Sequence, residues 1–343
     1  MKIATISTSI FRLPVSGYSG LEHLAWQISK GLAAKGHQVS VIAPEGSTCP
    51  GCTIIPCGPA GTWNEQQAFN SYWPHLLDQD CIIDHTWNKN SMMLKMEGRL
   101  KAPILSVMHA PVDTMYKELP PGVEKPCFVC ISEDQRSHFE ALFNHPARTA
   151  YNGVNTSYYS PINIPRSDRF LFLARFSTIK GPDLAISACK QVGVGLDLVG
   201  DVSITNEPEL YQRCQRECDE EQIRMVGPAT RAECVWWFSQ AHCLLHPNLR
   251  FREPLGLAPL EAQACECPVV AWRNGAMKET VLVGETGFLV NTLEEMIERI
   301  NQVKDGISDV MRKRCREWAS QFSEEKMVNR YEQLCYEALD GGW

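Results

Sequence analysis

The stretch from Leu244 to Val270 places the strongest constraint on the fold. It opens with a short apolar run, Cys243 to Leu245, which predicts a buried strand. A polar loop follows, and Pro254 then suits the first turn of a helix, where no backbone N–H is needed. The apolar residues beyond it predict a helix that continues to about Cys265. A strand, a loop and a helix in this order indicate an α/β fold.

The start of this helix is a candidate anion site. Leu255, Gly256 and Leu257 lie where backbone N–H groups have no partner inside the helix, and the helix dipole also favours negative charge. Glu253 lies just before the helix and Glu261 about two turns inside it, roughly 10 Å apart at the helical rise per residue. Carboxylates accept hydrogen bonds from paired hydroxyl groups, so the arrangement suits a sugar, a diphosphate and a ribose in a row. An ordinary capped helix with two exposed acidic residues explains the spacing equally well.

The residues of this stretch resemble the signature of the family 4 retaining glycosyltransferases. The resemblance lies in the run EPLGLAPLEAQAC, Glu253 to Cys265, followed by Pro268-Val-Val. Members of that family have the GT-B fold, so we expect an α/β protein with two Rossmann-like β/α/β domains facing across a cleft. The family usually has Phe at the position of Leu255 and Gly at the position of Glu266. A non-glycine residue at that helix end costs under about 1 kcal/mol, which is compatible with the fold.

Length and charge bound the domain organisation and the class of partner. A chain of 343 residues predicts two domains, and the resemblance implies an acceptor domain over 1–153 and a nucleotide-sugar donor domain over 154–321. The C-terminal helix, about 322–343, is expected to cross back to the first domain. The net charge of −7 favours neither a nucleic-acid partner nor an anionic membrane surface. We find no signal core and no run of ~20 apolar residues, so we expect a cytoplasmic protein without a strong membrane signal.

The opening of the chain is predicted to form a βαβ unit. Lys2 to Ile10 has a strand pattern, a loop of Gly, Ser and Pro follows at 14–20, and a helix begins near Leu21. Val39 to Ala43 is the next predicted strand. The loop lies at the carboxyl end of the first strand, where open α/β sheets bind ligands.

This opening resembles that of the family 4 enzymes, whose Gly-Gly-x-Glu loop lies between donor and acceptor. Here the loop has the sequence Ser19-Gly20-Leu21-Glu22, with one glycine replaced. The resemblance implies that Gly20 contacts the donor and Glu22 the acceptor, although Glu22 also suits the helix dipole as a first-turn acid. Tyr18 offers an aromatic face for stacking on an acceptor, or packs its own loop.

Two histidines follow predicted strands in the first domain. His85 comes after the strand Cys81–Asp84, and His109 comes after Ile104–Met108. Parallel strands end at the same edge of a sheet, so both side chains are candidates for a ligand site, although a single histidine is more often structural. The run VMHAP resembles the family's strand-end histidine beside the reacting sugar. His109 is therefore a candidate catalytic residue, and His85 a candidate acceptor ligand.

Two cations follow the first strand of the second domain. Arg175 and Lys180 lie between the predicted strand Phe170–Ala174 and the next helix, and together they suit a diphosphate. A single cation there would more commonly be a solvated loop residue. The context resembles the family's Gly-Arg-x-x-x-x-Lys-Gly loop, with Ala174 in place of Gly. The run Gly275–Glu279 likewise resembles the family's Gly-Gly-x-x-Glu with one glycine lost.

The fifteen cysteines do not form a recognisable disulfide framework, because their number is odd and no signal core is present. Cys127 and Cys130 fall on a predicted strand, where residues three apart point to opposite faces and cannot easily share one metal. Cys49-Pro-Gly-Cys52 is a predicted turn and a redox candidate, or with Cys57 a zinc candidate.

The whole pattern predicts a retaining glycosyltransferase that moves a sugar from a nucleotide-diphosphate sugar to a soluble acceptor and forms an α-glycosidic bond. No Asp-x-Asp motif is evident, so we expect no metal and no cofactor, with a UDP-sugar slightly favoured as the donor. The alternatives are a GT-B-like sugar-nucleotide epimerase, a phosphorylase, or a catalytically silent carbohydrate-binding homologue. The candidate catalytic residues are His109, Glu253, Arg175 and Lys180, and the candidate donor ligands are Gly20, Arg175, Lys180, Gly256, Leu257 and Glu261.

Overall fold

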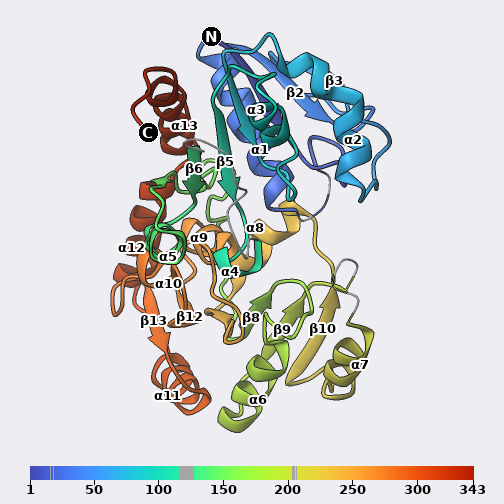
Figure 1. The fold of residues 1–343 in the computed structure, drawn as a ribbon. Coiled ribbons are helices and arrows are strands. Elements are labelled where there is room, and N and C mark those ends of the chain that lie inside the picture. Colours follow the sequence, from blue (N-terminus) through green and yellow to red (C-terminus); the bar gives the residue numbers. More distant parts are fainter. Residues whose placement is uncertain (16, 18, 116–126, 203–204, 206) are drawn as a thin grey trace. The chain divides into compact units, whose positions relative to one another are not determined.

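The computed structural model describes residues 1–15, 17, 19–115, 127–202, 205 and 207–343 of the chain (Figure 1). These residues form two compact units. The first unit comprises Met1–Gly153 together with Glu324–Trp343, and the second comprises Val154–Ser323. Each unit has its own parallel sheet and its own apolar core.

The described part of the first unit contains a seven-stranded parallel sheet in the order β3-β2-β1-β4-β5-β6-β7. The chain order reverses between β1 and β4, where Ile6 pairs with Asp84. Such a reversal in an open parallel sheet marks the usual ligand site, at the carboxyl ends of the strands. The strands are β1 Lys2–Ile6, β2 Gln38–Ala43, β3 Thr53–Pro56, β4 Cys81–Asp84, β5 Ile104–Met108, β6 Cys127–Cys130 and β7 Arg148–Thr149.

The strands near the middle of this sheet are buried along their whole length, because helices cover both faces of a parallel sheet. Two of the covering helices begin with a side-chain cap: Asn64 accepts from the backbone of Gln67, and Ser132 from that of Gln135. The helices are α1 Leu21–Ala34, α2 Glu65–Tyr72, η1 Trp73–Leu76, α3 Ser91–Met96, α4 Val112–Met115, α5 Glu133–Phe143 and α13 Glu324–Leu339.

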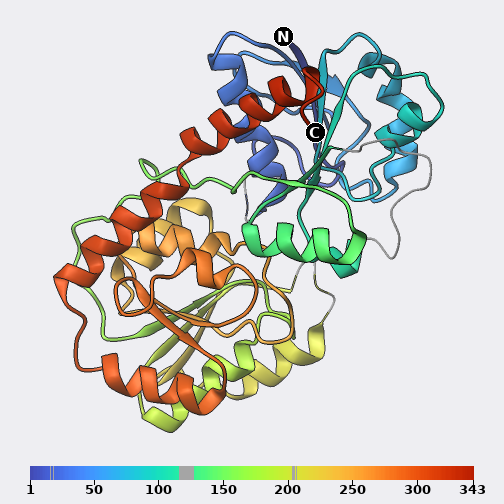
Figure 2. The same cartoon turned by 60° about the vertical axis from the view of Figure 1, so that its left-hand side comes forward.

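The C-terminal helix α13 packs along α1 in the first unit (Figure 2). The helices approach closely because Gly31 has no side chain: a Cβ at this position would collide with Val328. Charged contacts flank the packed faces, with Lys30 3.1 Å from Glu324 and His37 2.8 Å from Glu332. The return of the last helix to the first unit confirms this part of the predicted GT-B arrangement.

The described part of the second unit contains a six-stranded parallel sheet in the order β10-β9-β8-β11-β12-β13. Its order reverses between β8 and β11, where Leu171 pairs with Leu244. The carboxyl ends of these two strands therefore mark the expected ligand site of this unit. The strands are β8 Phe170–Leu173, β9 Leu196–Val199, β10 Ile223–Gly227, β11 Leu244–His246, β12 Val269–Trp272 and β13 Gly287–Val290.

Helices again follow the strands in the second unit, which confirms the predicted Rossmann-like α/β class. One of them, α8, begins with a capping box in which Thr230 and Glu233 satisfy each other's backbone N–H groups. The helices are α6 Pro182–Val192, α7 Pro208–Arg216, α8 Arg231–Gln240, α9 Leu257–Ala264, α10 Met277–Thr280, α11 Leu293–Val303, α12 Asp309–Ala319 and η2 Ser320–Phe322.

One predicted boundary is wrong in the first unit. The first strand ends at Ile6 and not at Ile10, because the carbonyls of Ser9 and Ile10 accept hydrogen bonds from the loop residues Thr62 and Gly61 and not from a neighbouring strand.

Another predicted boundary is wrong at the start of α9. The helix begins at Leu257 rather than near Pro254, because Gly256 has a φ of 84° and the backbone carbonyl of Glu253 accepts a hydrogen bond from Ala276 at 2.9 Å. A left-handed residue interrupts the helical path, so Glu261 lies just beyond the first helical turn and not two turns inside. The left-handed helix end expected at Glu266 is present, with a φ of 62°.

Candidate active site

The start of α9 carries the backbone amides that the sequence predicted as an anion site. Gly256 is the N-cap residue and Leu257 is the first helical residue. Their backbone N–H groups donate to no residue in the described part of the chain. Both groups are therefore available to an anion, and the helix dipole adds to their attraction. Glycine is required at 256, because φ is positive and a Cβ would collide with the end of Met277.

Glu253 lies immediately before this helix and is held through one carboxylate oxygen. Its Oε2 accepts a hydrogen bond from Nζ of Lys180 at 2.6 Å and another from Asn248. Nε2 of His246 lies 3.5 Å from the same oxygen. Oε1 accepts no hydrogen bond from a described residue, so one oxygen of the carboxylate is left for a ligand.

The surroundings of Glu253 keep it ionised. Burial raises the pKa of this carboxyl, but the charge of Lys180 and the contact with His246 outweigh burial, and the net pKa lies well below the ordinary value. Burial also lowers the pKa of His246, so this imidazole is neutral near pH 7. Glu253 is therefore a carboxylate with a fixed orientation, suited to accepting hydrogen bonds from hydroxyl groups.

The two predicted cations differ in their contacts. Lys180 pairs with Glu253, whereas Arg175, which follows β8 and is partly exposed, forms no ion pair or hydrogen bond with a described residue. A partly buried guanidinium without a partner has five N–H donors in a planar fork, which is the geometry that phosphate oxygens match. The structure thus places a guanidinium without a partner among the described residues near the carboxyl end of β8, where open parallel sheets usually bind ligands.

Glu261 is buried, with only 4% of the residue exposed. Its Oε1 lies 3.7 Å from Arg231, whose guanidinium also donates to the hydroxyl of Tyr159 at 3.1 Å. Burial raises the pKa of Glu261, and Arg231 offsets part of that rise. The second oxygen, Oε2, is buried and has no hydrogen-bond partner among the described residues. A hydroxyl donor would satisfy it, as the ribose assignment requires.

Several residues that contact Glu253 or Glu261 were not among the candidates predicted from the sequence. His246 and Asn248 come at and after the end of β11, so the strand-end argument applied to the first domain would also have found them. Arg231 and Tyr159 gave no such signal, because their contact with Glu261 joins three separate parts of the chain.

In the first unit the structure brings the two predicted histidines together. Nδ1 of His85 lies 2.8 Å from Nε2 of His109, and the ring centroids are 5.1 Å apart. His85 is fully buried, whereas His109 is partly exposed. Of the two histidines, therefore, only His109 is accessible to solvent.

Glu22 is also buried, with 4% of the residue exposed, and its carboxylate accepts hydrogen bonds from the hydroxyl groups of Thr8 and Ser19. Gly20 is the N-cap residue of α1, and its carbonyl accepts from the backbone of Leu24. Glu22 thus ties the loop between β1 and α1 to the end of the strand. Tyr18, the other predicted acceptor residue in this loop, lies outside the described residues.

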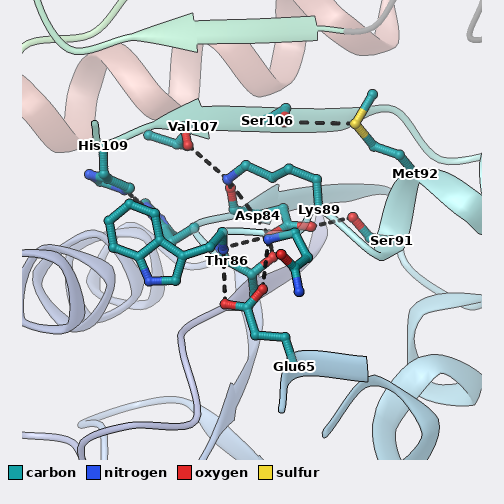
Figure 3. A network of polar contacts seen from close by, with 12 residues as sticks. Glu65, Asp84, Thr86, Lys89, Ser91, Met92, Ser106, Val107 and His109 are labelled. Carbon is teal, nitrogen blue, oxygen red and sulfur yellow. Dashed lines mark hydrogen bonds and ion pairs between the residues drawn. The ribbon is translucent and has the colours of Figure 1, made fainter. Parts of the chain in front are cut away.

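A buried lysine lies next to the histidine pair, and the sequence analysis did not identify it as a candidate site residue. Lys89 is 2% exposed, and its ammonium contacts backbone carbonyls on β4 and β5 (Figure 3). A lysine five positions after a strand resembles any exposed loop residue in sequence, because burial of its head group depends on the neighbouring strand.

The cysteines are all free thiols. Cys49 and Cys57 are buried, and Cys52 is partly exposed. In the CPGC turn the backbone N–H of Cys52 donates to the carbonyl of Cys49 at 3.1 Å. Within the described ranges, no group of three or more His, Cys, Asp or Glu side chains is arranged to hold a metal ion.

Two models of glycosyltransferase families match the chain. The model of Glycosyltransferase Family 4 matches residues 18–158, and the model of Glycosyl transferases group 1 matches residues 161–322. None of the helices in the described residues has the length and apolar character needed to span a membrane.

One curated relative is the D-inositol 3-phosphate glycosyltransferase of Arthrobacter sp. (strain FB24), which is 28% identical over 172 residues. The match covers 45% of this chain and 40% of the relative. In this match and in two others like it, the chain spans about a third to just over a half of the length of the curated relative.

Solved structures share the fold over the entire chain. The sucrose-phosphate synthase from Thermosynechococcus elongatus has a TM-score of 0.83 and 20% identity, with 100% of both chains covered. Anabaena HepE, solved in complex with UDP-glucose, has a TM-score of 0.76 and 17% identity, covering 97% of this chain and 98% of that one. With one glycosyltransferase model on each half, this chain belongs to the family 4 glycosyltransferases of the GT-B fold.

Proposed function

We propose that the chain transfers a sugar from a nucleotide-diphosphate sugar to a small soluble acceptor, with retention of configuration and an α-glycosidic product. The observation that carries this proposal is the set of unused anion-binding groups at the switch point of the second sheet. Arg175 has no partner in the described part of the chain, and the backbone N–H groups of Gly256 and Leu257 are also free. A diphosphate would satisfy all of them.

The same groups supply the chemistry that sugar transfer needs. Negative charge grows on the leaving diphosphate as the glycosidic bond breaks, and preorganised donors in a partly buried site stabilise it. Lys180 uses one of its three donors on Glu253, which leaves two for phosphate oxygens. We propose no metal ion, because two cations and the helix amides already provide positive charge at this position.

Glu253 is proposed to orient the donor sugar. Its Oε2 is occupied by Lys180 and Asn248, while Oε1 is free of contacts from described residues and suits a sugar hydroxyl. Because its carboxylate is held by Lys180 and Asn248, we assign Glu253 to bind a sugar hydroxyl and propose retention without a covalent glycosyl-enzyme intermediate. The free oxygen of Glu261 is proposed to accept from the ribose.

We assign the acceptor to the first unit, near His109 and the Glu22 loop. His109 is the accessible member of the histidine pair at the switch point of that sheet. A UDP-sugar is the favoured donor, and the UDP-glucose complex of the structural relative HepE supports this choice. The predicted cytoplasmic location stays a prediction.

Calorimetry with UDP, GDP and ADP and their glucose conjugates tests the donor site, with EDTA present. We expect one nucleotide to bind with 1:1 stoichiometry and its affinity to survive the chelator. Binding that requires Mg²⁺ or Mn²⁺, or no binding by any nucleotide-sugar, would contradict the proposal.

A screen of acceptors tests the reaction class. Release of nucleoside diphosphate should depend on a soluble acceptor and should yield an α-linked product. Conversion of the donor without an acceptor would identify an epimerase, and turnover that requires inorganic phosphate would identify a phosphorylase. Transfer only to lipid extracts, together with flotation on anionic liposomes, would show that the acceptor is not soluble.

A further inference from the structure

A buried ammonium joins the two strand ends that carry the histidine pair. The side chain of Lys89 is 1% exposed, and its Nζ donates to the backbone carbonyls of Asp84 and Val107, each at 2.7 Å (Figure 3). Asp84 is the last residue of β4 and immediately precedes His85, and Val107 lies on β5 two residues before His109. Lys89 therefore connects the backbones of both histidine-bearing segments.

The loop after β4, which contains Lys89, has an uncommon backbone conformation at this residue. Lys89 has a φ of 51°, in the left-handed region that side chains other than glycine rarely adopt. The Asp84 carboxylate lies 4.0 Å from Nζ and accepts hydrogen bonds from Thr86 and Ser91. Such conformations persist only where the surroundings determine them strongly, as they often do at functional sites.

Glu65 at the start of α2 fixes the same loop from outside the sheet. Its two carboxylate oxygens accept from the backbone N–H groups of Trp87 at 2.9 Å and Asn88 at 2.6 Å. Two carboxylates and one ammonium thus hold a loop of a few residues. Burying three charged groups costs more free energy than an ordinary polar turn would, which is consistent with a role of this network at the neighbouring site.

The histidine pair shares one hydrogen bond, whose direction follows from the other nitrogens. Nε2 of His85 is buried and has no partner among the described residues. If it carried the proton, a buried N–H donor would be left unpaired, which proteins avoid more strictly than an unpaired acceptor. The proton of His85 is therefore on Nδ1, which donates to Nε2 of His109. The proton of His109 must then lie on its own Nδ1.

The charges around the pair favour neutral rings. Burial and, to a smaller extent, the charge of Lys89 lower the pKa of His109 to about 3. Burial, then His109 and then Lys89 lower the pKa of His85 well below its ordinary value. Burial lowers the pKa of Lys89 itself to about 8, so the ammonium persists near pH 7. Among the described residues, the other titratable groups near the pair include Asp84, Glu65 and Tyr331, whose ring lies 6.2 Å from that of His85.

We propose that Lys89 and His85 are positioning residues that present His109 as a neutral hydrogen-bond donor through Nδ1. Lys89 fixes the two strand ends and keeps a positive charge beside them, and His85 occupies Nε2 of His109 as a donor. No described residue hydrogen-bonds to Nδ1 of His109. Its proton is therefore free for an oxygen of a substrate, so His109 acts as a donor and not as a general base. The catalytic part of this inference rests on the proposed function.

Nitrogen-15 NMR of the native full-length chain tests the tautomers directly. Correlations between ring nitrogens and ring protons distinguish a protonated nitrogen from a bare one, and the variants His85→Asn and His109→Asn assign the two signals. We expect both rings to carry their proton on Nδ1 and to stay neutral from pH 8 to pH 5. A proton on Nε2 of His109, or protonation of either ring within that range, would overturn the proposal. This measurement requires neither catalysis nor a folded Lys89 variant.

A pair of substitutions then separates positioning from simple packing. The amide nitrogen of Asn occupies the place of Nδ1, so His85→Asn keeps the donor to His109, whereas His85→Leu removes it. We expect kcat to fall about tenfold in His85→Leu, with most of it retained in His85→Asn. Equal losses in both variants would contradict the assigned donor.

The variant Lys89→Met tests the role of the ammonium, and nucleotide binding is measured in parallel as a test of the proposed function. In Lys89→Met we expect the His109 signal to begin titrating at a higher pH than in the native chain, and kcat to fall while nucleotide affinity is unchanged. An unaltered His109 titration in folded Lys89→Met would refute the role of the ammonium. Absence of nucleotide binding in the native chain would count against the proposed function alone, because the tautomers are read independently of it.

Discussion

Nζ of Lys180 lies 2.6 Å from Oε2 of Glu253, although 73 positions separate the two residues in the chain. The contact joins the loop before α6 to the segment before α9, on either side of the switch point of the second sheet. One cation thereby orients the carboxylate that lies three positions before Gly256, the N-cap residue of α9. The contact thus links a residue proposed to bind the sugar with a residue proposed to bind the diphosphate.

Removal of either cation should weaken binding of a nucleoside diphosphate. Arg175→Ala and Lys180→Ala would each remove a proposed charge-assisted phosphate contact, and we expect a loss of about 1.5–3 kcal/mol in binding free energy. Titration calorimetry measures the loss. Lys313→Ala, which removes an exposed lysine on α12, is the matched control and should bind like the native chain. Unchanged affinity in both site variants would refute the diphosphate assignment.

The free energy of unfolding of the second unit should fall at acid pH because Glu253 becomes protonated. Its pKa in the folded state lies below the ordinary value of 4.5, so its contribution is complete above that pH and is lost as pH falls toward the folded pKa. Urea unfolding followed by tryptophan fluorescence should show stability that decreases below about pH 4.5. Glu253→Gln has no charge to lose and should show a shallower decrease, and parallel curves for both proteins would argue against the ion pair with Lys180.

Glu261→Gln should weaken the binding of nucleotides but not of pyrophosphate. The free Oε2 is proposed to accept from a ribose hydroxyl, and loss of a hydrogen bond to a charged group costs about 1.5–3 kcal/mol. A competition assay with UDP and with pyrophosphate separates the ribose contact from the phosphate contacts. If pyrophosphate binding falls by the same factor, Glu261 acts on the site as a whole and the ribose assignment fails.

Gly256→Ala should lower both stability and nucleotide affinity. A left-handed alanine costs about 1–2 kcal/mol, and the added Cβ must also displace Met277. Gly193→Ala is a matched control in the same unit, because Gly193 has a φ of 80° and open space around its Cβ position. Thermal unfolding of the two variants isolates the crowding, and equal losses would show that Met277 moves aside freely.

Lys89 should make stability of the first unit rise with pH in the alkaline range. Burial lowers its pKa from 10.5 to about 8, so between these values the unfolded chain binds more protons than the folded one. Stability should therefore increase from about pH 8 toward 10.5, and Lys89→Met should lack this increase. Denaturant midpoints at intervals across the range provide the comparison, and a native curve as flat as that of the variant would indicate an unperturbed lysine.

The class of fold and most candidate residues could be predicted from the sequence because they depend on local patterns. Short apolar runs followed by helical periodicity specify alternating strands and helices, and parallel strands end at a common edge. His85, His109 and Arg175 were found in this way, since the two histidines follow a strand directly and Arg175 lies two residues after the end of β8. The backbone amides at Gly256 and Leu257 were likewise recognisable, although the helix starts later than expected.

Only the tertiary structure decided which of these residues meet. Lys180 with Glu253, Arg231 with Glu261, and the burial of Lys89 and His85 all join segments whose distance depends on strand order and packing. The local sequence does not identify which residue a side chain will contact across a sheet. The same lysine can be a solvated loop residue or a buried hydrogen-bond donor, depending on which segments pack against it. The sequence by itself therefore determined the kinds of groups at each strand end, and the packed fold determined their pairing and ionisation.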